Sequence, residues 1–260
     1  MAGLVHCDVE AGVATITLDS PGNRNALSRQ LVAELGVALD RAEQADVRAV
    51  VLTHTAPVFC AGADLKERAA DTATPAIGVS AGNPMANAMQ RLATMRAVTI
   101  AAVDGPARAG GIGLMAACDL VVVNPRITFA LTEVRIGVAP AIISVPILAR
   151  CGWSKLAAAW LTGEPFTAEA ARDMGLVTHV SDDVAGTVHA LVQGVLAGAP
   201  GAVAAAKQVL RQRTPSMDDP AVMAEMTALS DRLFRSEEAA EGMRAFAEKR
   251  PPRWAPEATS

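Results

Sequence analysis

The sequence has few aromatic residues and few thiols. Its 260 residues include five phenylalanines, three tryptophans and no tyrosine, so no phenolic hydroxyl is available as a proton donor. Four cysteines are widely separated and form neither a Cys-x-x-Cys pair nor a cluster with histidine: Cys7, Cys60, Cys118 and Cys151. Isolated cysteines of this kind are typical of buried thiols in a reducing compartment. We therefore expect neither a disulfide framework nor a metal site.

Positive charge and long apolar runs are also scarce. The formal net charge is -4, and the lysines and arginines are scattered along the chain, which gives no reason to expect nucleic acid as a partner. No stretch reaches the roughly 18 apolar residues of a membrane span, and residues 1–18 do not combine a basic start with an apolar block. We expect a cytoplasmic protein that has no membrane partner. Hydrophobic residues make up 51% of the chain, which is enough for a large buried core.

The pattern of apolar residues predicts alternating strands and helices. Apolar and β-branched runs at 13–18, 47–53, 98–103 and 119–123 alternate with segments of helical periodicity at 27–45 and 85–95. This order indicates an α/β fold with some parallel pairing. After Pro140 only 176–180 has the pattern of a strand, and the clearest helices are 202–213, 220–234 and 237–249. We expect a β-rich core followed by helices that cover a neighbouring subunit, and a mobile loop at 71–84.

A stretch with three glycines follows the predicted strand at 98–103. The sequence "AGGIGLMAACDL" (109–120) has no ionisable side chain before Asp119. One interpretation is a dinucleotide-binding loop, with Glu133 at about the spacing expected of the acidic residue. However, residues 104–109 separate the strand from the first glycine, and the segment lies in the middle of the chain. A second interpretation is that the glycines only let a helix pack closely on the sheet.

A third interpretation depends on a similar stretch earlier in the chain. In "VFCAGADLKE" (58–67) an apolar strand again leads through small residues into the start of a helix. The first turn of a helix leaves its backbone N–H groups unpaired, and the helix dipole favours negative charge there. Two such junctions can direct two N–H groups into one cleft and stabilise an oxyanion.

These two stretches, with four others in the same order, resemble the crotonase family, the enoyl-CoA hydratase and isomerase superfamily. The likeness extends from about residue 5 to residue 254. The six segments are "SPGNRNALS" (20–28), "FCAGADLKE" (59–67), "DGPARAGGIGLMAACDL" (104–120), "FALTEVRIGVAPA" (129–141), "LTGEPFTAEAARDMGLVTHV" (161–180) and "FAEKRPPRW" (246–254). The resemblance implies an α/β fold with a crotonase-like (ββα)n spiral core that holds the acyl-CoA site at 1–200. It also implies a helical trimerisation region at 201–260.

The resemblance further implies where an acyl-CoA thioester would bind. Its carbonyl would lie between the backbone N–H groups of Ala63 and Gly110. The segments implied to hold CoA contain Arg24, Ala26, Ala61, Asp64, Leu65 and Lys66. Lys249 is implied to contact a phosphate across a subunit interface. For the basic residues taken singly, a solvated surface charge is the alternative.

Only one of the two glutamates typical of hydratases in this family has a counterpart in this chain. The glutamate that relays the proton to the α-carbon corresponds to Glu133, whereas the one that holds the water corresponds to Gly113. A carboxylate in the apolar surroundings of "FALTEV" is expected to have a raised pKa and to act as acid or base near neutrality. The alternative for Glu133 is a salt bridge with Arg135. We expect the acyl group beside Gly113 and Ala141.

The resemblance predicts an enzyme but leaves its reaction open. An enoyl-CoA hydratase with Glu133 as its single acid/base is the expected function. In a Δ3,Δ2-enoyl-CoA isomerase the same carboxylate would remove a proton from C2 and return it at C4. Decarboxylation or C–C cleavage would use the same enolate, and a catalytically inactive acyl-CoA-binding protein is the alternative from another class. No cofactor is expected because CoA is part of the substrate, and a homotrimer or a dimer of trimers is implied.

Overall fold

The computed structural model describes residues 3–55, 57–67, 83–211 and 220–255, and the chain divides into two compact units. The first unit comprises Met1–His189 and the second comprises Ala190–Ser260. The boundary expected after residue 200 lies inside the second unit. The loop expected at 71–84 falls outside the described residues except for its last two positions, where the Asn83 side chain accepts hydrogen bonds from the first N–H groups of a helix.

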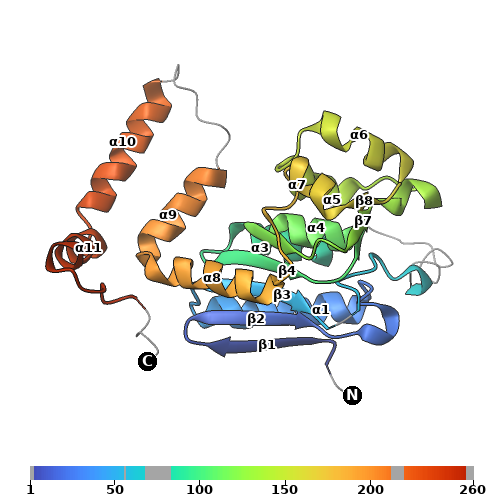
Figure 1. Ribbon diagram of the computed structural model, residues 1–260, viewed down its shortest axis with the longest axis horizontal. Coiled ribbons are helices and arrows are strands. Elements are labelled where there is room, and N and C mark those ends of the chain that lie inside the picture. The colour runs from blue at the N-terminus through green and yellow to red at the C-terminus, as the bar shows by residue number, and fades with distance from the viewer. Residues whose placement is uncertain (1–2, 56, 68–82, 212–219, 256–260) are drawn as a thin grey trace. The chain divides into compact units, whose positions relative to one another are not determined.

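The first unit is built on a six-stranded sheet, with the strands in the order β1-β2-β3-β4-β6-β9 (Figure 1). β1 is antiparallel to β2, and every other neighbouring pair is parallel. The strand bounds are β1 Val5–Glu10, β2 Val13–Leu18, β3 Ala49–His54, β4 Val98–Val103, β6 Leu120–Val123 and β9 His179–Val180. The predicted α/β class with parallel pairing is therefore confirmed. β1 was not predicted, because only one of its six side chains is buried and the others show no apolar period.

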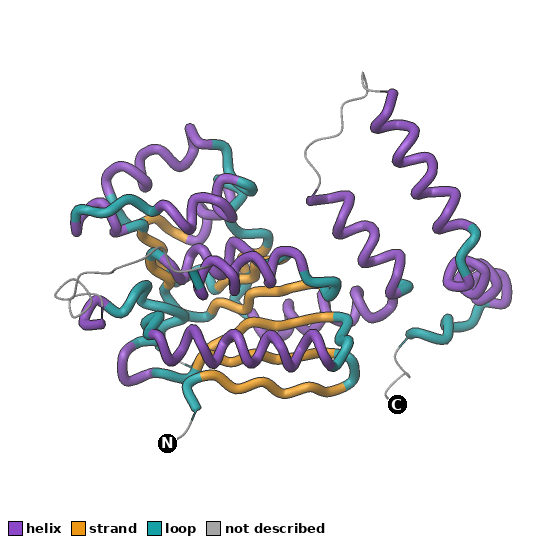
Figure 2. The backbone as a smooth tube through the Cα atoms, turned by 180° about the vertical axis from the view of Figure 1, so that it is seen from behind, coloured by secondary structure: helices purple, strands orange, loops and turns teal. Residues whose placement is uncertain are grey.

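Helices cover the buried sheet, and the sequence explains why they form. All six residues of β4 are buried, as expected for a central parallel strand covered on both faces. Helix α1 (Arg29–Gln44) places Leu31, Leu35 and Leu39 on one buried stripe and packs against β1, β2 and α3 (Figure 2). The Ser28 side chain caps α1 by accepting a hydrogen bond from the Leu31 N–H, 3.2 Å away.

A second, small sheet was not predicted. Its strands are β5 (Ala107–Arg108), β7 (Thr128–Ala130) and β8 (Phe166–Thr167), in the order β5-β7-β8. The expectation that 176–180 is the only strand after Pro140 is wrong, because β8 lies there too and β9 is only two residues long. Strands of two or three residues are too short to show an apolar period, so only their tertiary partners define them.

The remaining elements of the first unit are helices. They are the 3-10 helices η1 (Pro21–Asn23) and η2 (Thr132–Ile136), and the α-helices α3 (Pro84–Thr94), α4 (Gly110–Ala117), α5 (Ala141–Leu148), α6 (Trp153–Thr162) and α7 (Ala168–Asp173). α4 and α7 pack against the small sheet, α4 also packs against α3 and α5, and α6 packs against η2. All four cysteines of the chain are buried in this unit and none forms a disulfide.

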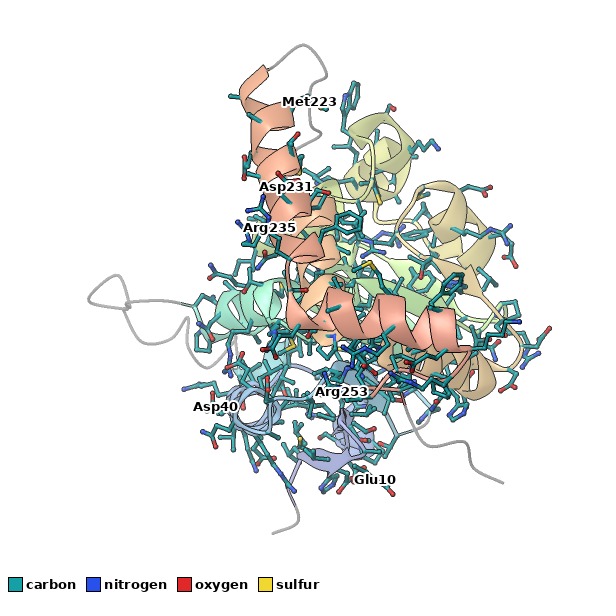
Figure 3. All side chains as sticks on the ribbon, turned by 90° about the vertical axis from the view of Figure 1, so that its left-hand side faces the viewer. Glu10, Asp40, Met223, Asp231, Arg235 and Arg253 are labelled. Carbon is teal, nitrogen blue, oxygen red and sulfur yellow. The ribbon has the colours of Figure 1, made fainter. Side chains whose placement is uncertain are left out.

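The second unit is helical, as predicted. It contains the end of α8 (Val184–Ala197), then α9 (Pro200–Arg211), α10 (Pro220–Phe234) and α11 (Glu237–Glu248). Figure 3 labels three residues that α10 and the turn after it expose to solvent: Met223, Asp231 and Arg235. Among the described residues no single helix is both long and apolar enough to span a membrane. Taken together, α8 and α9 reach that length and apolarity, but the chain bends by 113° between them.

Candidate active site

Two isolated bridges extend the small sheet and bring the singled-out segments together. Leu27 pairs in parallel with Ala63, and Cys60 pairs in parallel with Ala107 at the start of β5. β5 then pairs in parallel with β7, and the Ala109 N–H donates to the Ala130 carbonyl at the end of β7, at 3.1 Å. Segments 24–27, 60–63, 107–110 and 128–133 are therefore neighbours in space, although the sequence separates them widely.

The first candidate donor is the backbone N–H of Ala63. The flanking groups are fixed, because the Leu27 N–H donates to the Gly62 carbonyl at 2.8 Å and the Ala61 N–H donates to the Arg24 carbonyl at 3.1 Å. Gly62 has φ +90, and an added Cβ would lie 3.0 Å from the Ala109 Cβ. Within the described residues the Ala63 N–H has no recorded acceptor, and Ala63 is exposed. It is therefore available to bind an oxygen atom.

The second candidate donor is the backbone N–H of Gly110, the first residue of α4. The preceding Ala109 has φ 48 and ψ -118, a conformation that costs a non-glycine residue about 1–3 kcal/mol. This strained turn directs the chain from β5 into α4. Among the residues that the structure describes, no acceptor is recorded for the Gly110 N–H. An N–H at this position carries the partial positive charge of the helix end.

The glycines of α4 also allow close packing, as the second interpretation of this segment predicted. A Cβ on Gly111 would lie 2.6 Å from the Cys60 Cβ, and one on Gly110 would lie 2.6 Å from the Leu27 Cδ1. Packing thus excludes side chains from these two positions, and the Gly110 N–H has no acceptor within the part of the chain that the structure describes, so it stays a candidate donor. The dinucleotide interpretation is not supported, since the strand that enters this turn is β5 of the small sheet.

Glu133 is the candidate acid or base that the sequence singled out. It lies in η2, directly after β7, and its Oε2 is buried without a hydrogen-bond partner among the described residues. Burial raises the pKa of this carboxyl above its ordinary value, and only a hydrogen bond from its own backbone N–H opposes the shift. The alternative salt bridge with Arg135 is wrong: the Arg135 guanidinium donates instead to Glu164 and to the Thr162 carbonyl.

Gly113 lies in the buried interior of α4. A Cβ at this position would lie 2.5 Å from both the Met89 Cε and the Ile143 Cγ2. The place where typical hydratases of the family carry a second glutamate is thus filled by apolar side chains of α3 and α5. Ala141, the other residue expected at the acyl group, is exposed at the first position of α5.

The residues expected around CoA lie on the loops beside Ala63. Arg24 is exposed and has φ 60, while Ala26 is 8% exposed. Ala61 is half-buried, and Leu65 and Lys66 are exposed. Asp64 has a local role, since its Oδ1 accepts hydrogen bonds from the backbone N–H groups of Lys66 and Glu67. Lys249 is exposed at the end of α11 in the second unit.

Two further residues fix these loops and were missed in the sequence. Asn25 is fully buried: its Oδ1 accepts from the Ser20 N–H, and its Nδ2 donates to the Val58 carbonyl at 2.8 Å. His54 ends β3, and its Nε2 accepts a hydrogen bond from the Asp104 N–H. Each side chain hydrogen-bonds a backbone group that lies more than 30 positions away in the sequence. No local sequence pattern therefore indicates these contacts. No three histidine, cysteine, aspartate or glutamate side chains group as a metal site in the described ranges.

Comparison with known proteins shows the family of this chain. The family model described as enoyl-CoA hydratase/isomerase matches residues 8–257. An enoyl-CoA hydratase of Mycobacterium tuberculosis is 33% identical over 244 residues, which cover 91% of each chain. The solved structure of an enoyl-CoA hydratase from Mycobacterium avium is 41% identical with a TM-score of 0.70, covering 98% of this chain and 100% of that one. Another from Shewanella pealeana has a TM-score of 0.89 at 27% identity, covering 96% of each chain. The protein has the crotonase fold and belongs to the enoyl-CoA hydratase/isomerase family.

Proposed function

We propose that the protein is an enoyl-CoA hydratase that uses a backbone oxyanion hole and a single carboxylate. The thioester carbonyl of the substrate would accept hydrogen bonds from the N–H groups of Ala63 and Gly110. These two donors are preorganised by the small sheet and its bridges. Donors fixed where negative charge develops lower the barrier by several kcal/mol, because they do not reorganise during the reaction.

The observation that carries the proposal is the Oε2 atom of the half-buried Glu133, which is itself buried and has no hydrogen-bond partner among the described residues. Burial raises the pKa of this carboxyl, which makes it a stronger candidate to take and return a proton. In hydration, Glu133 would remove a proton from water as the oxygen adds to C3, and would then return that proton to C2. The enolate charge formed between these steps would lie on the thioester oxygen. The products balance as one 3-hydroxyacyl-CoA from one enoyl-CoA and one water.

A Δ3,Δ2-enoyl-CoA isomerase is the second candidate, and the packing around Gly113 favours it. Met89 and Ile143 occupy the place of a second carboxylate, so no such group orients a water there. Isomerisation needs one carboxylate, because Glu133 would take the proton from C2 and return it at C4. Both reactions pass through the same enolate and use the same three groups.

The substrate would be an acyl-CoA thioester, and no cofactor is needed because CoA is part of it. Arg24 and Lys66 are proposed to contact the CoA phosphates, with Ala26, Ala61, Asp64 and Leu65 lining the path. Both basic residues are exposed, so an anion in solution can reach them. Lys249 would supply a further phosphate contact from a neighbouring subunit of a homotrimer or a dimer of trimers. A cytoplasmic location remains a prediction from the sequence.

Two assays test the proposal. Hydration of crotonyl-CoA and isomerisation of a 3-enoyl-CoA are measured for the wild type and for Glu133→Gln. We expect the wild type to catalyse at least one reaction and the variant to lose it. The faster reaction identifies the enzyme as hydratase or isomerase. If the wild type binds CoA esters but neither reaction is faster than with Glu133→Gln, the protein is an acyl-CoA-binding protein and the proposal is wrong.

A further inference from the structure

His54 lies where the two segments that carry the candidate donors begin. It is the last residue of β3, and the segment after it leads to Ala63. Asp104 is the first residue after β4, the parallel neighbour of β3, and the segment after it leads to Gly110. The Asp104 N–H donates to the His54 Nε2 at 3.1 Å. One side chain thus joins the starting points of both segments.

The protonation state of the ring follows from its partners. The His54 Nδ1 lies 2.9 Å from the Thr55 carbonyl, which can only accept, so Nδ1 carries the proton. Nε2 is then the unprotonated nitrogen, which suits its role as acceptor for the Asp104 N–H. Burial lowers the pKa of His54, while the Thr55 carbonyl, the Asp104 carboxylate and the Val58 carbonyl oppose the shift. The neutral ring is therefore the form present at neutral pH.

Close packing surrounds the ring at this junction. The His54 ring packs edge-to-face on the fully buried Phe59, with centroids 5.4 Å apart. Gly105 approaches the same group so closely that a Cβ would lie 2.6 Å from the Pro57 carbonyl oxygen and 2.9 Å from the His54 Cε1. The separation of the two segments is fixed here by contacts with little freedom to adjust.

From this junction the two segments remain in contact up to the candidate donors. The Phe59 N–H donates to the Pro106 carbonyl at 3.2 Å, and the Arg108 N–H donates to the Cys60 carbonyl at 2.9 Å. Gly62 then lies against Ala109, directly before Ala63 and Gly110. A change in spacing at His54 would therefore be transmitted along the paired backbone to both N–H groups.

We propose that His54 is a positioning residue that sets the separation of the Ala63 and Gly110 N–H groups by joining the ends of β3 and β4. The proposal rests on the proposed function, in which these two groups bind an enolate oxygen. His54 itself touches no reacting atom. Its contribution is to hold the donors at the spacing that an oxyanion needs, since small misplacements of such groups cost up to about 100-fold in rate.

The test measures how strongly the protein prefers an enolate over a neutral thioester. The dissociation constant of acetoacetyl-CoA, which forms an enolate, is compared with that of butyryl-CoA, which does not, at one neutral pH. The ratio of the two constants reports on the oxyanion donors, whereas butyryl-CoA binding alone reports on the rest of the site. The variants are His54→Leu, His54→Gln and Gly105→Ala, with His6→Gln on β1 as the matched control.

We expect His54→Leu to reduce the preference for the enolate by about 10-fold or more with butyryl-CoA binding little changed. His54→Gln should restore most of the preference, because its side-chain carbonyl can accept from the Asp104 N–H. Gly105→Ala should also reduce the preference for the enolate, because its Cβ would push against Pro57 and His54. This variant keeps the proposal testable if His54→Leu does not fold. His6→Gln should match the wild type.

The outcomes separate the two proposals. If the wild type prefers the enolate and both His54→Leu and Gly105→Ala keep that preference, the proposed role of His54 is wrong, while the oxyanion hole still stands. Equal loss in His54→Gln and His54→Leu would also overturn it, because the acceptor would then not matter. A wild type with no preference for the enolate would refute the oxyanion hole itself, and the role of His54 would fall with it.

Discussion

Glu133 is subject to opposite demands from catalysis and from stability. Burial raises the pKa of this carboxyl, and its Oε2 has no hydrogen-bond partner among the described residues, which suits a group that takes and returns a proton. The same burial disfavours the ionised form in the folded protein, because the carboxylate is better solvated in the unfolded chain. At Gly113 the constraint is steric, because Met89 and Ile143 leave no space for a side chain.

Glu133→Gln is expected to raise the free energy of unfolding at neutral pH. Since the pKa of Glu133 is higher in the folded state than in the unfolded state, the wild type loses stability as pH rises from the ordinary carboxyl pKa through the raised one. The amide does not ionise, so the advantage of the variant is full above the raised pKa and vanishes below the ordinary one. Urea unfolding at several pH values measures this difference. An advantage that is independent of pH would contradict the assigned ionisation.

Gly113→Ala is expected to lower the free energy of unfolding by roughly 1–3 kcal/mol, because its Cβ would overlap Met89 and Ile143. Gly36→Ala in α1 is the matched control, since nothing lies within 4 Å of its added Cβ. The control should be neutral or stabilise by about 0.4–1 kcal/mol. Urea unfolding compares the two. Equal stabilities for both variants would show that Gly113 is not packed as described.

At the scale of elements, long strands could be predicted and short ones could not. The runs at 13–18 and 98–103 show sustained apolar patterns, so their strands were found within one or two residues. β5, β7 and β8 have two or three residues each and are defined only by the strands they pair with. The pairing of β5 with β7 nevertheless brings the segments that lead to Gly110 and Glu133 side by side. The motifs singled out Ala63, Gly110 and Glu133 as candidates, whereas the contacts of Asn25 and His54 could be seen only in the folded structure.

In the second unit, α11 and the residues after it are joined at Glu241. Its side chain is 3% exposed and accepts from Arg250 Nη1 at 2.7 Å, Arg250 Nη2 at 3.2 Å and the Arg253 N–H at 3.1 Å. The hydrogen bonds from the Arg250 guanidinium lower the pKa of Glu241 to about 2. This carboxylate thus ties the C-terminal segment back onto the helix.

Glu241→Gln is expected to speed amide hydrogen exchange in α11 at neutral pH, because the charge-assisted hydrogen bonds are lost. A lowered pKa means that the stabilisation is fully present above the ordinary carboxyl pKa and is lost as pH falls toward about 2. The difference between variant and wild type should therefore shrink in acid. Glu248→Gln is the control, since Glu248 also pairs with Arg250 but is 52% exposed. Exchange as fast in the control as in Glu241→Gln would contradict the special role of Glu241.

At the scale of the whole molecule, the second unit exposes large apolar side chains. Phe246 is 88% exposed, Phe234 is 69% exposed and Met243 is 54% exposed. Met243 and Phe246 lie three residues apart on α11 and therefore on one face of it, and exposed apolar side chains grouped on a helix face are typical of an interface. We therefore expect these helices to contribute to the proposed trimer or dimer of trimers.

Phe246→Glu is expected to shift the protein toward monomers in sedimentation velocity, because the charge would have to be desolvated in the interface. Ala247→Glu adds the same charge at the next residue of α11 and is the matched control, with a smaller effect expected. A stable wild-type monomer would refute both the assembly and the proposed phosphate contact of Lys249 across subunits. A Phe246→Glu variant as fully assembled as the wild type would exclude this face from the interface.

The most direct test of the proposed function is the turnover number of Glu133→Gln at saturating enoyl-CoA. Glu169→Gln, which changes an exposed glutamate in the first turn of α7, is the matched control. We expect Glu133→Gln to lose about 100-fold or more in kcat while it still binds the substrate, and the control to keep wild-type turnover. If Glu133→Gln turned over its substrate as fast as the wild type, Glu133 would not be the acid or base of this enzyme.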